Sequence, residues 1–457
     1  MKVLFCASEV APFASTGGLG DVSGSLPLAL GKLGIEVMVM MPRYRGLPAD
    51  KQRLADNVHI YFVEHEAYFN RAALYGNERG DYPDNLKRFS FFCHESLSLA
   101  KRTGFKPDLV HANDWQTGLL PAILKTKLSA DPFFKNVKTL LTVHNLAYQG
   151  HFPRELYPEL ELDPALFSAE GFEFFGKINL LKGGLVFSDA ISTVSPTYAH
   201  EIQTKDYGFW LEDIVKKKAK VLRGILNGID TALWDPAQDR FLKSGYSKEN
   251  PGGKKDDKLE LQRVCGFEIN PRAPLFGMVT RLAEQKGMDL FAEIADSLLS
   301  QEVQFVLLGD GDAVYKTVFR NIAVRHAKKA AVSFDFDLAK AHRIYAGADF
   351  FLMPSLYEPC GLGQLISLKY GTIPVARRTG GLADTIVDAD KDPKNGNGFL
   401  FEERNADKLF KAIERAIAAY RDERRFATLQ EHAMRLDFSW DKSAKAYQQF
   451  YKEILSR

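Results

Sequence analysis

The sequence predicts an α/β protein with two Rossmann-like domains, each built on a parallel β-sheet. Short runs rich in Val, Ile, Leu and Phe alternate with longer amphipathic stretches, as buried parallel strands alternate with helices. The 457 residues exceed what one hydrophobic core usually holds. Polar residues and glycines follow many of the predicted strands, and ligands of open parallel sheets bind at that edge. We therefore expect two sheets whose carboxyl edges face each other across a central cleft.

The predicted strands form two series. Those of the first half are Lys2–Ser8, Glu36–Met41, His59–Glu64, Asp108–Ala112, Thr139–Val143, Ala190–Val194 and Val221–Ile225. Those of the second half are Leu275–Thr280, Gln304–Leu308, Ala331–Phe334, Phe350–Pro354, Ile373–Ala376 and Gly398–Phe401. Helices are clearest at Asp21–Leu33, Phe174–Phe187, Met288–Ser300, Leu338–Ala346 and Ala406–Arg421, and a last amphipathic helix follows Ser439.

The domain boundary is predicted after residue 236. Between the two series of strands lies Asp235–Asn270, which contains the cluster Asn250-Pro-Gly-Gly-Lys-Lys-Asp-Asp257. Glycine, proline and charge together are typical of a linker or a surface loop. We expect residues 1–236 to form an N-terminal domain and residues 237–438 a C-terminal domain.

Composition and charge argue against several classes of protein. The net charge is only +2 and its signs are well mixed, so the basic stripe of a nucleic-acid binder is absent from the sequence. No apolar run reaches the ~18 residues of a membrane span, and Met1–Ser8 is better explained as a buried strand than as a signal peptide. The four cysteines are too scattered for a zinc or redox motif. We expect a soluble cytoplasmic protein with reduced thiols, without nucleic-acid or membrane partners.

The most informative motif is Glu358-Pro-Cys-Gly-Leu-Gly-Gln364, which follows the apolar strand at residues 349–355 and opens a helix. It offers a carboxylate at a strand end, together with backbone N–H groups at Cys360 and Gly361 that a ligand could approach. A helix N-terminus of this kind binds hydroxyl- and phosphate-bearing ligands. Cys360 is expected to pack or to contribute its backbone, because no histidine lies near it in sequence to activate a thiolate.

A second cluster, Ser15-Thr-Gly-Gly-Leu-Gly-Asp-Val22, lies at the first strand-to-helix turn. It lacks the G-x-G-x-x-G spacing of a dinucleotide fingerprint, and no acidic residue closes the second strand. Gly17 and Gly18 are expected to let a phosphate or a sugar approach the helix N-terminus. The alternative is a tight turn with a purely structural role.

Further candidates follow other strands. Arg281 and Lys286 lie between a strand and a helix, where a fixed guanidinium and a mobile ammonium together suit a diphosphate. Two solvated loop charges are the alternative. Asp114 and His144 follow strands of the first half, and either could equally be a hydrogen-bonded turn residue.

Taken together, the motifs resemble one family over nearly the whole chain. They are Thr16–Val22, His111–Gln116, Thr142–Gly150, Thr193–Tyr198, Ile225–Asp230, Arg281–Lys286, Tyr357–Gly361 and Arg378–Asp384. The chain resembles the bacterial glycogen or starch synthases, which are retaining glucosyltransferases of family 5 with the two-domain GT-B fold. The resemblance implies that the last helix, residues 439–457, joins the N-terminal domain.

The resemblance also implies a reaction. Glucose would pass from ADP-glucose to the non-reducing 4-hydroxyl of an α-1,4-glucan such as glycogen, with retention and with no metal or other cofactor. Arg281 and Lys286 match the pair that neutralises the leaving diphosphate, and Glu358 matches the carboxylate that binds glucose hydroxyls. His144 matches a residue near the glucose 6-hydroxyl and the anomeric centre, and Asp114 another polar group of the sugar site.

The remaining implied residues fall into two groups. On the donor side are Ser15, Gly17, Gly18, Asn227, Cys360, Gly361, Thr379, Gly380 and Gly381. On the acceptor side are Glu9, Asp21 and Tyr75. No motif indicates an oligomeric state.

Two departures from the family keep alternatives open. Ser15 stands where the family has Lys, and Gly363 stands where it usually has Thr. A lost phosphate contact of this kind costs ~1–3 kcal/mol, judged from hydrogen bonds to charged groups. The alternatives are a glycosyltransferase of the same fold with another nucleotide sugar or acceptor, and a glucan-binding protein with weakened catalysis. A dehydrogenase is the least supported.

Overall fold

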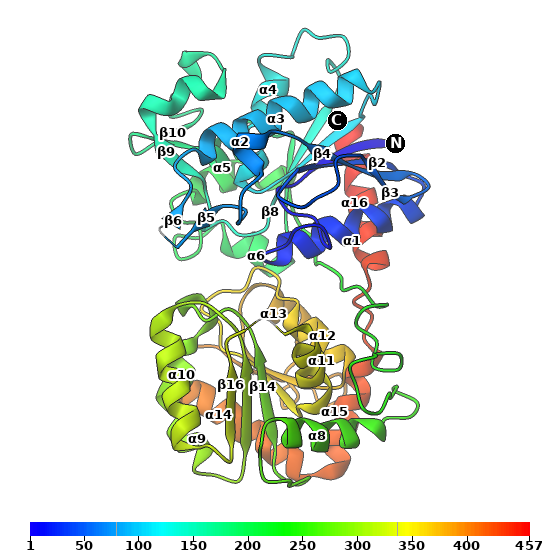
Figure 1. Cartoon of the computed structure of the whole chain (residues 1–457), viewed down its shortest axis with the longest axis vertical. Helices are drawn as coiled ribbons and strands as arrows, with labels where there is room; N and C mark the ends of the chain where they lie inside the picture. The colour runs from blue at the N-terminus through cyan, green and yellow to red at the C-terminus, as the bar shows by residue number, and fades with distance from the viewer. Residues whose placement is uncertain (79, 336) are drawn as a thin grey trace. The chain divides into compact units, whose positions relative to one another are not determined.

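The computed structural model describes residues 1–78, 80–335 and 337–457 (Figure 1). The chain divides into two compact units, Met1–Gly228 with Trp440–Arg457, and Ile229–Ser439. The boundary predicted after residue 236 falls inside the second unit. Residues 229–236 belong there because the Ile229 N–H donates to the Phe438 carbonyl over 2.8 Å and the Trp234 ring stacks on His342 at 4.1 Å between centroids.

Unit 1 is built on an eight-stranded sheet. In the order β13-β12-β8-β7-β1-β2-β4-β3, its strands are Leu222–Gly224, Ala190–Thr193, Lys138–Val143, Leu109–Asn113, Lys2–Cys6, Glu36–Pro42, Val58–Val63 and Gln52–Ala55. Neighbouring strands are parallel except for the edge strand β3, which pairs antiparallel with β4. Since the chain proceeds outward from β1 in both directions, the strand order reverses between β1 and β7. This reversal is the topological switch point of unit 1.

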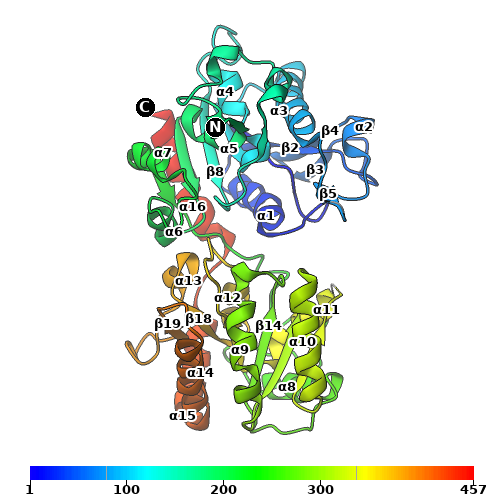
Figure 2. The ribbon, with the colours of Figure 1, turned by 90° about the vertical axis from the view of Figure 1, so that its left-hand side faces the viewer.

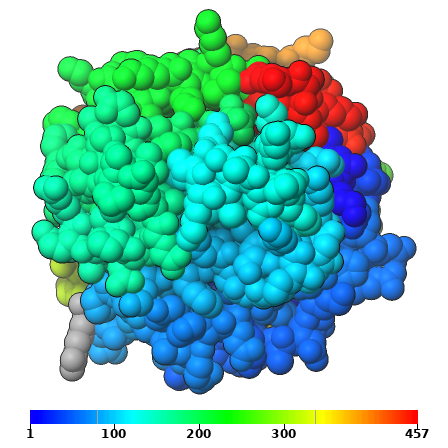
Figure 3. Space-filling model, turned by 90° about the horizontal axis from the view of Figure 1, so that it is seen from above, coloured from blue at the N-terminus to red at the C-terminus, as the bar shows by residue number. Residues whose placement is uncertain are grey.

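Helices cover both faces of this sheet (Figures 1 and 2). One face carries α1 (Gly18–Lys32) and α16 (Trp440–Leu455), and the other carries α3 (Asn85–Arg102), α4 (Leu120–Lys125) and α5 (Leu180–Phe187). Shorter helices are α2 (Glu66–Phe69), α6 (Pro196–Glu201) and α7 (Glu212–Lys217). The buried His111 ring ties α16 to the sheet, because Nδ1 bonds the Tyr451 hydroxyl at 2.7 Å and Nε2 bonds the Thr142 hydroxyl at 2.6 Å. The C-terminal residues accordingly lie against the N-terminal segment in Figure 3.

Small antiparallel pairings decorate unit 1. Strands β9 (His151–Pro153), β11 (Lys177–Asn179) and β10 (Glu173–Phe174) form one sheet, and β5 (Gly76–Asn77) pairs with β6 (Gly80–Asp81). The helix predicted at 174–187 is therefore wrong in its first half and begins only at Leu180. Phe175 and Gly176 adopt positive φ values of 49° and 76°, which turn the chain into a hairpin instead of a helix.

Unit 2 is built on a six-stranded sheet whose neighbouring strands are all parallel. In the order β16-β15-β14-β17-β18-β19, its strands are Ala330–Ser333, Gln304–Leu308, Leu275–Val279, Phe350–Met353, Ile373–Arg377 and Phe399–Phe401. The order reverses between β14 and β17, which makes this the switch point of unit 2.

Alternate residues of these strands serve two separate cores. Phe276 and Met278 pack with α9 (Met288–Leu299), α10 (Ala313–Arg325) and α14 (Ala406–Arg421), whereas Leu275 packs with α8 (Gly253–Val264), α11 (Leu338–Gly347) and α12 (Gly363–Lys369). Figure 1 shows these two groups of helices on opposite faces of the sheet. The unit is completed by α13 (Gly380–Thr385) and α15 (Glu423–Arg435). Burial on both faces explains why the strands are continuous apolar runs.

Every predicted strand is present, with ends that differ by at most two residues, but the edge strand β3 was not predicted. One correction concerns Asp235–Asn270, predicted as a linker or surface loop, because it contains α8. This helix packs against α11 and the segment just before β17, in part through lysine side chains. Lys258 pairs with the buried Asp349 at 2.6 Å, and Lys254 Nζ donates to the Ala346 carbonyl at 2.7 Å. In the described ranges, every helix is too short or too polar to cross a membrane.

Candidate active site

In unit 1, predicted site residues gather where strands β1, β7 and β8 end, at the switch point of the sheet. Glu9 follows β1, Asp114 follows β7 directly, and His144 follows β8 directly. All three are buried. The structure brings Asp114 and His144 together, because Asp114 Oδ1 accepts a hydrogen bond from the His144 backbone N–H at 2.7 Å.

Asp114 occupies an unusual backbone conformation for a residue with a side chain. Its φ is 55° and its ψ is −171°, and such values persist at functional sites where surrounding contacts hold them. Burial raises its pKa to about 7, and the charge of Glu9 adds to this shift, while the His144 and Asn145 N–H groups oppose it. Asp114 is therefore a carboxyl group that exchanges its proton near neutral pH.

The His144 imidazole is neutral and fixed in one tautomer. Burial lowers its pKa to about 3. Its Nε2 lies 2.9 Å from the Asn113 Oδ1, and the Asn113 amide nitrogen donates to the Cys6 carbonyl at 3.0 Å. Because the Asn113 oxygen can only accept, Nε2 carries the proton and Nδ1 retains its lone pair. No pattern in the sequence indicates that Asn113 orients this ring.

Glu9, Tyr75 and the glycine-rich turn form a second connected group. Glu9 Oε1 accepts from the Tyr75 hydroxyl at 2.6 Å and from the Thr16 hydroxyl at 2.7 Å, and Tyr75 is also 2.8 Å from the Ser8 hydroxyl. Desolvation, and then the charge of Glu9, raises the pKa of Asp21 to about 6. The three residues predicted on the acceptor side therefore interact, and Glu9 fixes the turn that begins α1.

The turn itself leaves open space at its glycines. A Cβ atom added at Gly17 or Gly18 meets nothing within 4 Å, so the fold does not require glycine at either position. Ser15 is exposed, and its hydroxyl donates to the Gly17 carbonyl at 3.2 Å. The 15-residue helix α1 begins at Gly18, and no side chain caps it. Its first N–H groups are thus accessible to an anion or a hydroxyl group.

Asn227 stands apart from this group. It follows β13, at the edge of the sheet, and it is buried. Its Oδ1 has no hydrogen-bond partner within the described part of the chain. No described contact joins it to Asp114 or His144.

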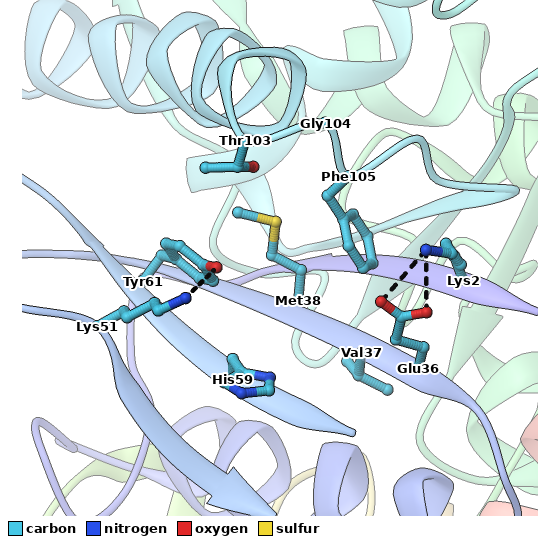
Figure 4. Close-up of a pocket in the computed structure, with 10 residues that line it drawn as sticks. All are labelled: Lys2, Glu36, Val37, Met38, Lys51, His59, Tyr61, Thr103, Gly104 and Phe105. Carbon is cyan, nitrogen blue, oxygen red and sulfur yellow. Dashed lines mark hydrogen bonds and ion pairs between the residues drawn. The ribbon is translucent and has the colours of Figure 1, made fainter. Parts of the chain in front are cut away.

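A hollow of about 250 Å³ lies at the amino ends of β1, β2 and β4, opposite the edge that carries Glu9 and Asp114. Figure 4 shows two bonded pairs in its lining, in which Lys2 pairs with Glu36 at 3.0 Å and Lys51 donates to the Tyr61 hydroxyl at 3.3 Å. None of the predicted site residues lines it.

In unit 2, the candidate residues lie at the switch point between β14 and β17. Lys286, in the loop after β14, pairs with Glu358, in the loop after β17, at 2.6 Å between Nζ and Oε2. The Lys286 side chain is 17% exposed and that of Glu358 only 7%. The Ser355 hydroxyl also donates to Glu358 Oε2, at 3.1 Å. The sequence placed both residues in a site but gave no reason to expect this ion pair.

The β14 loop is held against the β17 loop by its backbone. The Leu356 N–H donates to the Gln285 carbonyl at 2.8 Å. Gly287 has a φ of 70°, and a Cβ there would lie 2.0 Å from the Pro354 carbonyl oxygen. Arg281 lies at the surface with Nη2 at 3.4 Å from Gln285 Oε1. The two cations therefore differ, since Lys286 is fixed and largely buried whereas Arg281 is accessible.

Gly380 and Gly381, the first two residues of α13, bring the start of this helix close to the Glu358 loop. An added Cβ at Gly380 would lie 1.9 Å from the Glu358 carbonyl oxygen, and one at Gly381 would lie 2.1 Å from the Cys360 carbonyl oxygen. The Gly381 N–H donates to the Glu358 carbonyl at 3.1 Å. Thr379, just before them, is buried. These glycines are explained by close packing of the start of α13 against this loop.

The motif from Glu358 to Gln364 opens a helix, as predicted. The helix α12 starts at Gly363 and has seven residues. Cys360 is buried, as expected for a packed residue, and the Gln364 amide binds the carbonyls of Cys360 and Gly361 at 2.9 and 3.0 Å. At Gly363 an added Cβ would approach the Phe351 ring to 2.9 Å, which explains the absence of a larger residue there.

Arg377 is a residue that the sequence analysis missed. Its buried guanidinium donates to the Ser355 carbonyl at 2.8 Å, to the Leu356 carbonyl, and to the Glu402 carbonyl at 3.3 Å. It therefore braces the loop that carries Glu358. A charged residue at the end of the otherwise apolar strand β18 was the available signal.

Two doubly wound parallel-sheet units, each with polar side chains at its switch point, have the architecture of the GT-B class of glycosyltransferases. Residues 2–217 match the family model described as the starch synthase catalytic domain, and residues 266–430 match glycosyl transferases group 1. The chain is 45% identical over 476 residues to glycogen synthase 2 of Geobacter sulfurreducens, covering 99% of this chain and 98% of the relative. It is 45% identical over 479 residues to the glycogen synthase of Syntrophotalea carbinolica, covering 100% and 99%.

Two solved structures resemble this chain in fold. The catalytic domain of starch synthase IV from Arabidopsis thaliana, bound to ADP and acarbose, matches with a TM-score of 0.92 and 34% identity, covering 100% of this chain and 99% of that one. A sucrose-phosphate synthase from Thermosynechococcus elongatus shares the fold, with a TM-score of 0.67 at 17% identity. The chain belongs to the glycogen and starch synthase family and is a glucosyltransferase. The predicted family and GT-B fold class are confirmed.

Proposed function

We propose that this chain transfers glucose from ADP-glucose to the non-reducing 4-hydroxyl of an α-1,4-glucan, with retention of the anomeric configuration. The observation that carries the proposal is the buried pair of Lys286 and Glu358 at the switch point of unit 2. It combines a fixed cation with a carboxylate, and these are the groups that a sugar diphosphate requires. The relative bound to ADP and acarbose supports a nucleotide and a glucan as ligands.

Lys286 and Arg281 would neutralise the leaving diphosphate. The Glu358 carboxylate holds the Lys286 ammonium in place before any substrate binds, so little reorganisation accompanies charge development. Both described bonds to Glu358 end on Oε2, and Oε1 would accept from a glucose hydroxyl. The accessible Arg281 would supply a forked donor to the phosphates.

The unit 1 residues would serve the sugar and the acceptor. The neutral His144 offers a lone pair at Nδ1, and Asp114 offers a carboxyl group whose pKa of about 7 suits hydrogen bonding in either protonation state. The backbone N–H groups at Gly17 and Gly18, where α1 begins, would donate to phosphate or glucose oxygens of the donor substrate. Glu9, Tyr75 and Asp21 would contact the glucan acceptor.

In the proposed step the bond between glucose C1 and the diphosphate oxygen breaks, and a bond from C1 to the acceptor O4 forms on the same face. The acceptor proton passes to the departing diphosphate oxygen, so the atoms and charges balance without a protein nucleophile. No metal or other cofactor takes part in this proposal. We also propose a cytoplasmic location, which the four free cysteines support because reduced thiols persist there.

The test is a donor assay with glycogen as acceptor. Labelled ADP-glucose and UDP-glucose are supplied separately, and both label in precipitated glycogen and released nucleoside diphosphate are measured, with and without glycogen. We expect glycogen-dependent release from ADP-glucose, unchanged by a chelator, and near-complete loss of transfer in Glu358→Gln.

Other results point to the alternatives. Preferential use of UDP-glucose, or transfer only to a small acceptor, would replace the proposal with a different glycosyltransferase activity. Tight glycogen binding without any nucleotide release would indicate a glucan-binding protein.

A further inference from the structure

Unit 1 exposes two large aromatic rings beside each other, on segments 35 residues apart. Phe175 is 74% exposed and Trp210 is 77% exposed, which makes Trp210 the most exposed large hydrophobic side chain among those described. Their ring centroids are 5.9 Å apart and the rings are nearly perpendicular, at 83°. We call this pair the aromatic platform. Exposed aromatic surface of this kind marks an interaction site.

At both platform residues the backbone has a conformation that residues with large side chains rarely adopt. Phe175 has a φ of 49° and Trp210 a φ of 69°, and Phe209 before it has a φ of 48°. Positive φ is unfavourable for bulky residues, because the side chain crowds the following carbonyl. Three such aromatic residues around one exposed surface are evidence that the chain fixes the platform in a set shape.

A buried amide connects the two segments that carry the platform. The Gln149 side chain donates to the Phe209 carbonyl at 3.0 Å, and its oxygen accepts from the Asn179 amide at 2.6 Å. Asn179 ends β11, whose hairpin turn contains Phe175. Gln149 and Asn179 are both buried. The hairpin and the Trp210 segment are therefore held relative to each other by a specific network.

We propose that the aromatic platform binds an α-1,4-glucan chain and anchors polymeric acceptors to unit 1. This inference rests on the proposed function, because it names a second contact for the same acceptor. Glucose rings have apolar C–H faces that stack on aromatic rings, and aromatic side chains with few rotatable bonds bind at low entropic cost. Two perpendicular rings present two stacking surfaces to consecutive residues of a curved chain. Because the platform is already ordered, binding does not have to order it.

Such an anchor matters only for a long acceptor. A polymer held at the platform presents its ends to the transfer site at a high effective concentration, which a short oligosaccharide cannot gain. The platform should therefore lower the KM for glycogen and leave kcat unchanged.

The test compares the full-length chain with the double variant Phe175→Ala, Trp210→Ala. Tyr61→Ala is the matched control, since Tyr61 is a partly exposed aromatic residue of unit 1 in the hollow at the amino ends of the strands. Migration in native gels with and without glycogen gives binding independently of catalysis. Kinetics with glycogen and with maltotriose separate polymer anchoring from transfer.

We expect the double variant to lose retardation by glycogen and to show a KM for glycogen about tenfold higher, the size of one aromatic hot-spot contact. The kcat of the double variant, and its KM for maltotriose, should equal those of the parent chain. The single variant Trp210→Tyr should keep most of the glycogen binding, because it retains an aromatic ring. Tyr61→Ala should bind glycogen and transfer glucose as the parent does. Retardation by glycogen in a chain that transfers no glucose would refute the proposed function and support the platform.

Three results would overturn the platform. The first is unchanged glycogen retardation in the double variant. The second is an equal loss with glycogen and with maltotriose, since this would assign Trp210 to the transfer site itself. The third is a change in oligomeric state on gel filtration with glycogen binding intact, since this would make the two rings an interface between copies of the chain.

Discussion

Removing the lysine of the Lys286–Glu358 pair should destabilise unit 2 more than removing the carboxylate. In Lys286→Met, Glu358 keeps its charge and its single bond from Ser355 while its side chain is only 7% exposed. A buried charge left without its partner costs about 3 kcal/mol. In Glu358→Gln, the amide can still accept from Ser355, and the lysine can turn toward water, so the expected loss is about 1 kcal/mol.

The double variant Lys286→Met, Glu358→Gln isolates the interaction. With the charge of Glu358 already removed, loss of the lysine should add little, and the double variant should lose about 1.5 kcal/mol in total. The single losses sum to about 4 kcal/mol, so the coupling energy is about 2.5 kcal/mol. An exposed pair in the same unit provides the control. Arg435→Met, which removes the ion pair with Glu431, should cost no more than about 0.5 kcal/mol.

Urea unfolding followed by tryptophan fluorescence measures these free energies, with Trp234 reporting on unit 2. Donor kinetics on the same proteins check that Glu358→Gln lowers kcat strongly despite its small cost in stability. Equal losses in the two single variants, or losses that simply add, would refute the reasoning that the buried Glu358 carboxylate depends on Lys286 as its partner.

Three further predictions concern residues of both units. Ser15→Lys should lower the KM for ADP-glucose about fivefold, ~1 kcal/mol, if this exposed position faces the donor phosphates, and unchanged constants would withdraw that role. Between about pH 4 and pH 7, Asp114 keeps its proton in the folded protein but releases it in the unfolded chain, so the unfolding free energy should fall as the pH rises. Urea unfolding measured across this pH range should show the fall in the parent chain and lack it in Asp114→Asn. Arg377→Met should cost about 2 kcal/mol in urea unfolding and lower kcat, because it frees the loop that carries Glu358; unchanged kcat would mean that Arg377 serves folding alone.

The architecture was accessible from the sequence because its signal is repeated along the chain. Each buried strand is an apolar run, so these strands were found within two residues of their ends, whereas the partly exposed edge strand β3 has no such run and was missed. The segment at 235–270 was misjudged because α8 buries lysines, whose charge suggests a surface. The hairpin at Phe175 was missed because two aromatic residues followed by glycine fit a helical pattern, while their positive φ depends on the tertiary network around Gln149.

The candidate site was less accessible, because its geometry depends on contacts between distant segments. Strand-end positions and the family resemblance selected Glu358, Lys286, Asp114 and His144, but pattern alone could not show which of them touch. His111 illustrates the difficulty, since it resembles His144 in sequence context but binds Tyr451, 340 residues away, and has a structural role. Sequence position identifies such residues, whereas their roles depend on tertiary partners.

The tetrapeptide Thr-Gly-Gly-Leu occurs at Thr16–Leu19 and at Thr379–Leu382, each time between a strand and a helix. The two glycine pairs have different physical reasons. At Gly380 and Gly381 a Cβ would collide with backbone oxygens at 1.9 and 2.1 Å, and Gly380 has a φ of 43°, whereas at Gly17 and Gly18 nothing lies within 4 Å. The fold therefore requires the second pair, and the open space at the first pair fits the proposed approach of a ligand.

This difference predicts opposite outcomes for the same substitution. Gly380→Ala should destabilise unit 2 by at least about 2 kcal/mol, because both strain and overlap oppose it. Gly17→Ala should leave the unfolding free energy unchanged or raise it by about 0.5 kcal/mol, because alanine restricts the unfolded chain. If donor phosphate or sugar approaches Gly17, the same variant should nevertheless raise the KM for ADP-glucose or lower kcat. Urea unfolding and donor kinetics on both variants decide the matter, and a Gly17→Ala protein with full stability and full activity would remove the first glycine pair from the ligand site.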